Sequence, residues 1–238
     1  MTSIPLFISA EYPCSYLDNA TARNCFLHPS TPMTTEIYSK LISHGFRRSG
    51  NQIYRPHCAD CSACTALRLP VNEFKATRGQ RRTHLSNTLT RSIIKPAQFE
   101  QKHYQLYLEY QDARHADSSM ANASPEEYMS FLCNDWCETR FVEFTYDTEL
   151  VAVAVVDHLD NALSAVYTFF APKYSHLSPG RYAILWQIDY AQQLGVQWLY
   201  LGFWIAQCQK MSYKNQYRPV QAFIDNQWRQ FDKNQSIG

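Results

Sequence analysis

The chain has 238 residues, of which 45% are hydrophobic and 14% aromatic, a composition that supports a substantial core and excludes an intrinsically disordered protein. A formal net charge of +1 excludes a nucleic-acid binder that relies on an overall basic excess. No stretch approaches the roughly 18 apolar residues of a membrane span, and residues 1–5 lack the features of a signal peptide, so we expect a cytoplasmic protein with reduced cysteines.

The first predicted helix begins near Pro32 and ends before Gly45, since its apolar residues fall on one face. Residues 51–74 are predicted to form short strands and turns. Residues 77–91 are predicted to form a polar, basic helix or loop. A domain boundary is expected near the proline that follows this basic run, which gives an N-terminal domain of residues 1–95 and a C-terminal domain of residues 96–238.

Positive charge is concentrated between Arg47 and Arg91. This segment holds nine basic residues against two acidic ones, Asp60 and Glu73, so it can present a positive face although the whole chain is nearly neutral. A solvated charged surface is the alternative interpretation. The basic residues are Arg47, Arg48, Arg55, Arg68, Lys75, Arg78, Arg81, Arg82 and Arg91.

The C-terminal half alternates helices and strands. One helix should carry Tyr104 to Tyr110, and a capping box at Ser124 starts another that should run to about Cys137. Three strands, one helix, a fourth strand and a last helix are expected to follow, and this order is that of an acetyltransferase-like α/β domain. The three strands are residues 140–146, 150–156 and 163–170, and a turn at 157–161 joins the last two. Residues 150–156 are continuously apolar, so this strand should be central and covered on both faces. The helix is predicted at 180–194 and the fourth strand at 196–203.

Three cysteines spaced three apart, Cys58, Cys61 and Cys64, can turn their sulfurs toward one centre. Together with Cys14 they can form a four-sulfur site for zinc or an iron-sulfur cluster, because thiolates select those metals. A packing cluster of small buried thiols is the alternative. We expect the other cysteines, Cys25, Cys133, Cys137 and Cys208, to pack in the interior.

Several motifs occur in an order that resembles the aminoacyl-tRNA-protein transferase family, and the spacing is similar to that of the short bacterial aspartate/glutamate leucyltransferase type. The resemblance covers nearly the whole chain. In the N-terminal half it is carried by residues 14–17, 45–50, the cysteine cluster, Arg68 and residues 80–82; in the C-terminal half, by residues 182–188, 200–205 and Lys210-Met211-Ser212-Tyr213-Lys214.

This resemblance implies a GNAT-like C-terminal domain joined to a cysteine-containing N-terminal α+β domain. It implies transfer of leucine from Leu-tRNA to the α-amine of proteins that begin with Asp or Glu, which marks them for degradation. The implied partners are aminoacylated tRNA and those proteins, not DNA or a membrane, and the transfer needs no cofactor. The expected substrate-binding residues are Arg47, Arg48, Tyr54, Arg68, Gln80, Arg81 and Arg82; the expected tRNA-binding residues are Trp204, Lys210, Tyr213 and Lys214; the expected metal ligands are Cys14, Cys58, Cys61 and Cys64.

Three other functions stay open at this point. Arginine can replace leucine as the donor with the same chemistry. A coenzyme-A-dependent acetyltransferase is disfavoured because the stretch before residue 182 has a single glycine, Gly180, and Pro179 removes a backbone donor for pyrophosphate. A metal-stabilised RNA-binding module without activity is the third. No catalytic base is assigned, although Asp157 and Glu143 lie near strand positions and can accept a proton.

Overall fold

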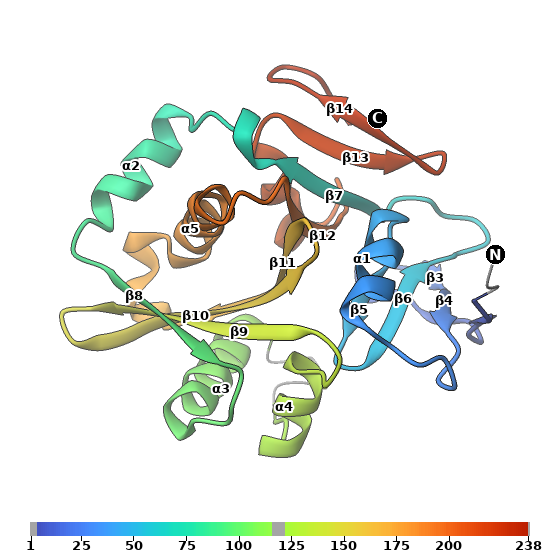
Figure 1. The fold of residues 1–238 in the computed structure, drawn as a ribbon, viewed down its shortest axis with the longest axis horizontal. Coiled ribbons are helices and arrows are strands. Elements are labelled where there is room, and N and C mark those ends of the chain that lie inside the picture. The colour runs from blue at the N-terminus through green and yellow to red at the C-terminus, as the bar shows by residue number, and fades with distance from the viewer. Residues whose placement is uncertain (1–3, 116–121, 238) are drawn as a thin grey trace.

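The computed structural model describes residues 4–115 and 122–237 and has a mixed α/β fold around one eight-stranded sheet. The expected α/β class is thereby confirmed. The strand order is β14-β13-β7-β12-β11-β10-β9-β8, so segments from distant parts of the chain lie side by side (Figure 1). The strands are β7 (Thr65–Pro70), β8 (Arg91–Pro96), β9 (Glu138–Tyr146), β10 (Glu149–Leu159), β11 (Ala162–Phe170), β12 (Trp198–Trp204), β13 (Val220–Ile224) and β14 (Gln227–Phe231).

The apolar strand β10 lies inside this sheet, between β9 and β11. Every residue from 151 to 156 is at most 2% exposed. Alternate side chains enter two different cores: Ala152 and Val156 pack in the core that includes α5, while Val153 and Val155 pack in the core that includes α3 and α4. The prediction of a strand covered on both faces is confirmed. The helices are α2 (Arg78–Ser86) and α5 (Pro179–Gln193) on one side, α3 (Gln101–His115) and α4 (Pro125–Leu132) on the other (Figure 1).

A smaller sheet of order β1-β4-β6-β5 lies beside the large one (Figure 1). Helix α1 buries Tyr38 and Ile42 in a third core that also holds Ile53 of β6 and Leu159 of β10. This contact fixes the small sheet against the large one. The helix before Gly45 and the strands within residues 51–74 are confirmed. The strands of the small sheet are β1 (Leu6–Ile8), β4 (Asn24–Leu27), β5 (Arg47–Ser49) and β6 (Gln52–Pro56), and the helix is α1 (Thr35–Ser43). Strands β2 (Tyr12–Pro13) and β3 (Thr21–Ala22) pair with each other in a separate two-stranded sheet.

Strand β7 is antiparallel to both β12 and β13 and lies between them. The large sheet therefore joins residues from both sides of position 95. Four short helical segments also flank its strands. They are η1 (Val71–Glu73), η2 (Pro172–Leu177), α6 (Gln209–Ser212) and η3 (Tyr213–Gln216). Among the described residues, no helix has the length and apolar character needed to cross a membrane.

One helix is shorter than predicted. The helix that begins with the Ser124 capping box ends at Leu132, not near Cys137. Its continuation is diverted by Asn134, whose Oδ1 accepts hydrogen bonds from the backbone N–H groups of Trp136 (3.1 Å) and Cys137 (2.6 Å). Asparagine favours such local turns over helix.

The expected last helix is present in a short form, α6 (Gln209–Ser212), and the chain then ends in a hairpin that the sequence did not predict. Strands β13 and β14 are joined at Asp225 and Asn226, which both have positive φ (52° and 59°). This conformation suits a tight two-residue turn, and Asp and Asn tolerate it better than most residues do. The predicted turn at 157–161 is also shorter, because Asp157 lies within β10.

Candidate functional site

The parallel strands β11 and β12 separate partway along the sheet. Their pairing covers Ala162–Ser164 and Trp198–Tyr200, although β11 continues to Phe170 and β12 to Trp204. Beyond the last pair, the facing backbone carbonyl groups need a donor other than the neighbouring strand. A buried polar group without a partner costs about 1–3 kcal/mol, so the divergence must be filled.

The guanidinium of Arg47, at the start of β5, fills this gap. Its Nη1 donates to the carbonyl of Leu201 at 3.2 Å, and its Nη2 donates to the carbonyls of Ala165 (2.9 Å) and Val166 (2.6 Å). Arg47 thus joins the two strands and places a positive charge where they diverge. The sequence predicted a carboxylate-binding arginine here, whereas these donors are bonded to backbone.

Gly202 in β12 makes room for that guanidinium. It has φ +74°, and a Cβ atom built on it lies 1.0 Å from Arg47 Nη1. The register of β12 against β7 shifts between Tyr200 and Gly202, which marks an irregularity at the same point. A glycine inside an otherwise bulky strand signals such a close approach.

The segment η3 lies along the C-terminal end of β12. Lys214 Nζ donates to the carbonyl of Phe203 at 2.7 Å. Burial lowers the Lys214 pKa well below its usual range, and the charge of Arg47 lowers it further. Tyr213 is 39% exposed, yet desolvation by the surrounding protein raises its pKa to about 12.

A hollow of about 280 Å³ opens beside the end of β12. Phe203 and Ile205 line it from β12 and the residues after it, and Tyr54 lines it from β6. Tyr16 lines it too; this residue is 45% exposed, and desolvation raises its pKa to about 12. Burial also raises the pKa of Tyr54. The positive charge of Arg47 lowers the pKa of both Tyr16 and Tyr54, so the guanidinium lies near enough to act on this space. The predicted residue Tyr54 therefore lies in the hollow.

The four predicted metal ligands, Cys14, Cys58, Cys61 and Cys64, line the same hollow and are free thiols. Burial raises the pKa of Cys64 to about 12, and the neighbouring thiols of Cys58, Cys14, Cys61 and Cys208 contribute in the same direction. A protonated thiol is a poor nucleophile at neutral pH, so Cys64 is unsuited to attack a substrate. The four thiols are soft donors around one space, the type of ligand that zinc and iron-sulfur clusters take. Among the described residues, however, no three of these sulfurs lie within 4.8 Å of one another.

Arg48 is not available to a substrate. Its side chain and that of Asp157 are both 0% exposed, and Nε and Nη2 of Arg48 donate to the two carboxylate oxygens of Asp157 at 2.6 Å. Nη2 also donates to the carbonyl of Leu132 and to Thr139 Oγ1. The prediction that Arg48 binds the acceptor carboxylate is therefore wrong, because this fork already holds a carboxylate of the protein itself.

Arg68 is held by aromatic rings on the sheet. Its guanidinium lies 3.7 Å from the ring centre of Trp198 and 4.3 Å from that of Trp228. It also donates to Gln221 Oε1 at 2.9 Å and to the Tyr200 hydroxyl at 3.3 Å. Arg68 therefore links β7, β12 and β13, and the structure does not bring it to the hollow.

Gln80, Arg81 and Arg82 belong to α2. The Gln80 side chain completes the capping box with Thr77, and its Nε2 donates to the carbonyl of Gln216 at 3.1 Å. The start of α2 is thereby tied to η3. Arg81 and Arg82 are exposed, and Arg81 donates to the carbonyl of Ala76.

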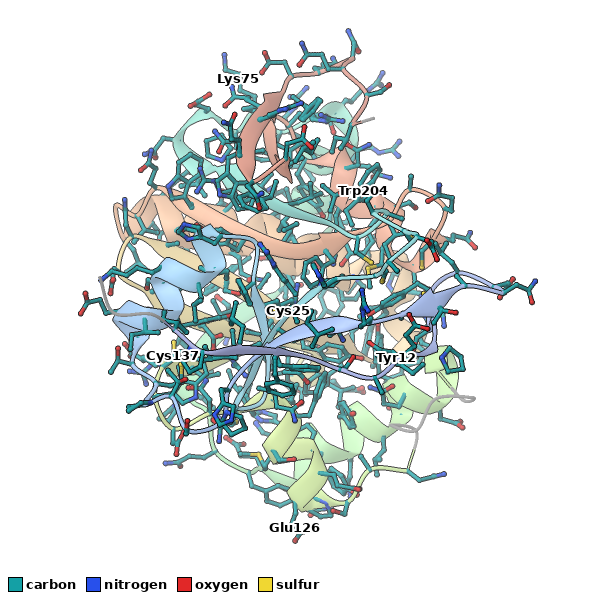
Figure 2. The ribbon with its side chains drawn as sticks, turned by 90° about the vertical axis from the view of Figure 1, so that its right-hand side faces the viewer. Tyr12, Cys25, Lys75, Glu126, Cys137 and Trp204 are labelled. Atoms are coloured by element: carbon teal, nitrogen blue, oxygen red, sulfur yellow. The ribbon has the colours of Figure 1, made fainter. Side chains whose placement is uncertain are left out.

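The residues predicted to bind tRNA separate into buried and exposed ones. Trp204 is 5% exposed and packs in the core, so the prediction that it stacks on a base is wrong. Figure 2 labels Trp204 in the upper half of the molecule, below Lys75. Lys210 is exposed, and its Nζ donates to the carbonyl of Arg114 at 3.3 Å. Lys214 faces Arg47, as described above.

Neither carboxylate considered as a base is free. Asp157 is held by Arg48, and Glu143 is 3% exposed. Burial alone raises the pKa of Glu143, but hydrogen bonds from Lys102, Lys95 and His103 lower it to about 2. Among the described residues, Glu143 also forms a close group of potential metal ligands with Glu100 and His103. The two lysines already neutralise this group, so it does not require a cation.

Sequence reasoning did not single out two residues of the site, Tyr16 and Gly202, for their positions in it. Gly202 carried a usable signal, because it interrupts a run of large apolar residues from Trp198 to Trp204. Tyr16 carried no such signal, since an aromatic residue in a loop between short strands is compatible with many roles.

Both halves of the chain match models of one protein family. The model described as "Arginine-tRNA-protein transferase, N terminus" matches residues 12–82. The model described as "Arginine-tRNA-protein transferase, C terminus" matches residues 102–224. The two matches occur in the expected order and leave only short segments uncovered.

Similar proteins extend over nearly the whole chain. The aspartate/glutamate leucyltransferase of Hahella chejuensis (strain KCTC 2396) is 43% identical over 228 residues, which cover 96% of this chain and 97% of that protein. The protein of the same name from Pseudomonas aeruginosa (strain LESB58) is 45% identical over 228 residues, with the same coverage.

Among solved structures, FemX has a TM-score of 0.46 at 9% identity, covering 78% of this chain and 77% of that one. The structure of L-PGS from Bacillus licheniformis has a TM-score of 0.47 at 10% identity, covering 59% of this chain and 45% of that one.

Proposed function

Because this chain belongs to the arginine-tRNA-protein transferase family, and is thus an aminoacyltransferase, we propose that it transfers leucine from Leu-tRNA to the α-amine of proteins that begin with Asp or Glu. The support for leucine as donor and for acidic acceptors is the 43–45% identity to aspartate/glutamate leucyltransferases over 96% of the chain. The product would carry an added N-terminal leucine and be marked for degradation.

The observation that best supports this proposal is the hollow beside the divergence of β11 and β12. An acetyltransferase-like sheet opens toward its acyl donor between two parallel strands, and we propose that the C-terminal half is such a GNAT-like domain. The aminoacylated 3′ end would enter here, with Tyr213 and Tyr16 as aromatic faces for unstacked bases. Arg47 supplies positive charge near this space, since its charge acts on Tyr16 and Tyr54, which line the hollow.

The chemistry asked of the protein is modest. The ester of an aminoacyl-tRNA is already activated, so the enzyme mainly has to hold an amine against its carbonyl carbon and stabilise the oxyanion that forms. No covalent enzyme intermediate is needed, in keeping with the raised pKa of Cys64. We propose that the charge of Arg47 attracts the acidic side chain of the acceptor, since Arg48 is already bonded to Asp157.

We propose that the exposed arginines of α2 contact tRNA phosphates instead of the acceptor. Arg78, Arg81 and Arg82 are exposed on this helix, and Lys75 is exposed just before it. The bond from Gln80 to Gln216 connects this helix to η3, so a tRNA whose 3′ end enters beside Tyr213 would pass this basic surface. Phosphate contacts of this kind position the nucleic acid.

The N-terminal end of helix α5 does not support the coenzyme A alternative. Pro179 occupies the first turn of that helix, and a Cβ built on Gly180 lies 3.4 Å from the ring of Phe170. An added methyl group would therefore make an ordinary contact with β11, and Pro179 leaves one backbone donor fewer for a pyrophosphate.

The proposed activity is tested by incubating the protein with Leu-tRNA or Arg-tRNA and peptides that begin with Asp, Glu or Ala. We expect mass spectrometry to detect one added leucyl residue on the Asp and Glu peptides, none on the Ala peptide, and no product with acetyl-CoA. Arginyl product in place of leucyl product would contradict the donor assignment. Acetylated product would favour the acetyltransferase.

We further propose that Cys14, Cys58, Cys61 and Cys64 together hold zinc or an iron-sulfur cluster, because all four line one hollow. Protein purified without oxygen should then contain about one metal centre per chain, measured by elemental analysis and absorption. Cys61→Ser should lower that content, whereas Cys133→Ser, which changes a thiol outside the hollow, should not. A folded, active protein without either metal would refute the site.

A further inference from the structure

The aminolysis of an ester releases a proton that something must accept. The α-amine of the acceptor attacks as a neutral nitrogen, and the first adduct carries an extra proton on that nitrogen. The two carboxylates considered above cannot take this proton readily, because Asp157 is bonded to Arg48 and Glu143 is bonded to Lys95, Lys102 and His103. A different acceptor is needed near the end of β12.

Lys214 lies at this position. Its Nζ is 2.7 Å from the carbonyl oxygen of Phe203, and Phe203 lines the hollow. The next residue upstream, Tyr213, is 39% exposed. The lysine on η3 therefore bonds directly to the backbone of a residue that lines the hollow, and the charge of Arg47 from β5 acts on it.

The surroundings favour a neutral amine on Lys214. The charged and titratable groups that face it are the Arg47 guanidinium on β5 and the Cys208 thiol in the turn after β12; β12 itself contributes a carbonyl group. Burial and the charge of Arg47 both lower the Lys214 pKa, and Cys208 opposes them. A desolvated lysine beside another cation becomes reactive in this way. While one N–H donates to Phe203, the lone pair stays available.

We propose that Lys214 accepts the proton of the acceptor amine and returns it to the departing tRNA. As the amine nitrogen bonds to the ester carbonyl carbon, its proton moves to Lys214 Nζ. As the bond between that carbon and the ribose oxygen breaks, the proton moves from Nζ to this oxygen. The products are the leucylated peptide and tRNA with a free terminal hydroxyl, and Lys214 is again neutral. This inference rests on the proposed function.

The sharpest variants are Lys214→Met, which removes the amine, and Lys214→Arg, which carries a permanent charge and can neither accept nor release a proton. Loss of a general base costs roughly 10²- to 10⁴-fold in rate. We expect kcat to fall by about this factor in both variants while KM for Leu-tRNA stays within about threefold. Lys40→Met is the matched control, because Lys40 is an exposed lysine on α1 paired with Glu36, and it should keep wild-type rates.

The dependence on pH gives a second readout. Because the base must be deprotonated, the single-turnover rate of the wild type should rise with pH through the pKa of Lys214, and Lys214→Met should lose that rise apart from the titration of the acceptor amine itself. Small primary amines should restore part of the activity of Lys214→Ala, which a purely structural lysine would not allow.

The possible failures are distinct. If the wild type forms no leucylated product, the proposed function fails. If the wild type is active and Lys214→Arg keeps its kcat, Lys214 serves as a cation and the inference is overturned. A weakened affinity for tRNA with unchanged kcat would overturn it as well and would restore Lys214 as a phosphate contact.

Discussion

Replacing Arg48 by methionine should lower the free energy of unfolding by about 3–5 kcal/mol. The substitution leaves the carboxylate of Asp157 fully buried without its cation, and it also removes donors from the carbonyl of Leu132 and from Thr139 Oγ1. For a chain of this size the midpoint of thermal unfolding should fall by roughly 6 to 20 °C. Chemical denaturation followed by circular dichroism measures the effect.

Two control variants distinguish the loss of a buried ion pair from the loss of a charged side chain at the surface. Arg229→Met breaks the exposed pair with Asp225, whose side chains are 51% and 74% exposed, and should cost less than about 1 kcal/mol. The double variant Arg48→Met with Asp157→Leu should recover much of the loss, since it removes both charges. If Arg48→Met is no more harmful than Arg229→Met, the pair does not hold α4 and β10 together as described.

Replacing Gly202 by alanine should lower kcat/KM by on the order of 100-fold or more, because the added methyl group takes the place of the Arg47 guanidinium. The built Cβ lies 1.0 Å from Arg47 Nη1, so the arginine must leave the divergence of β11 and β12. The carbonyls of Leu201, Ala165 and Val166 would then lose their donors. Leucyl transfer and thermal unfolding should be measured on the same preparation.

Gly195→Ala is the matched control for backbone strain. Gly195 also has a positive φ, +71°, but nothing lies within 4 Å of a Cβ built on it. It should show the cost of the left-handed conformation alone, about 1 kcal/mol in stability, with activity retained. If both glycine variants behave alike, the contact with Arg47 does not matter. When Arg47 is already replaced by alanine, Gly202→Ala should lower kcat/KM little further.

Patterns confined to one segment predicted the elements best. The apolar run of β10 and the capping box at Ser124 both depend on neighbouring residues, and both are confirmed. Strand β8 was not predicted from the sequence. Residues 91–96 end in a proline, and they are recognisable as a strand mainly through their pairing with β9 at the edge of the sheet. Edge strands accept proline, which weakens their signal.

The roles of the arginines depended on distant partners. Arg47 and Arg48 are adjacent in sequence, yet one bonds to backbone more than 100 residues away at the divergence of β11 and β12 and the other to Asp157. Bidentate geometry suits a substrate carboxylate and a protein carboxylate equally, so residue type could not distinguish them. The cysteines and Tyr54 were predicted to belong to the site, and the structure brings them to one hollow.

The position of β7 between β12 and β13 has a consequence for how the chain assembles. During synthesis, residues 65–70 leave the ribosome long before the strands that flank them, residues 198–204 and 220–224. Until those arrive, β7 has two open edges that can pair with other chains. The central sheet therefore closes late, and its contacts between remote segments favour slow folding. Neither half, made alone, contains a complete set of neighbours for this strand.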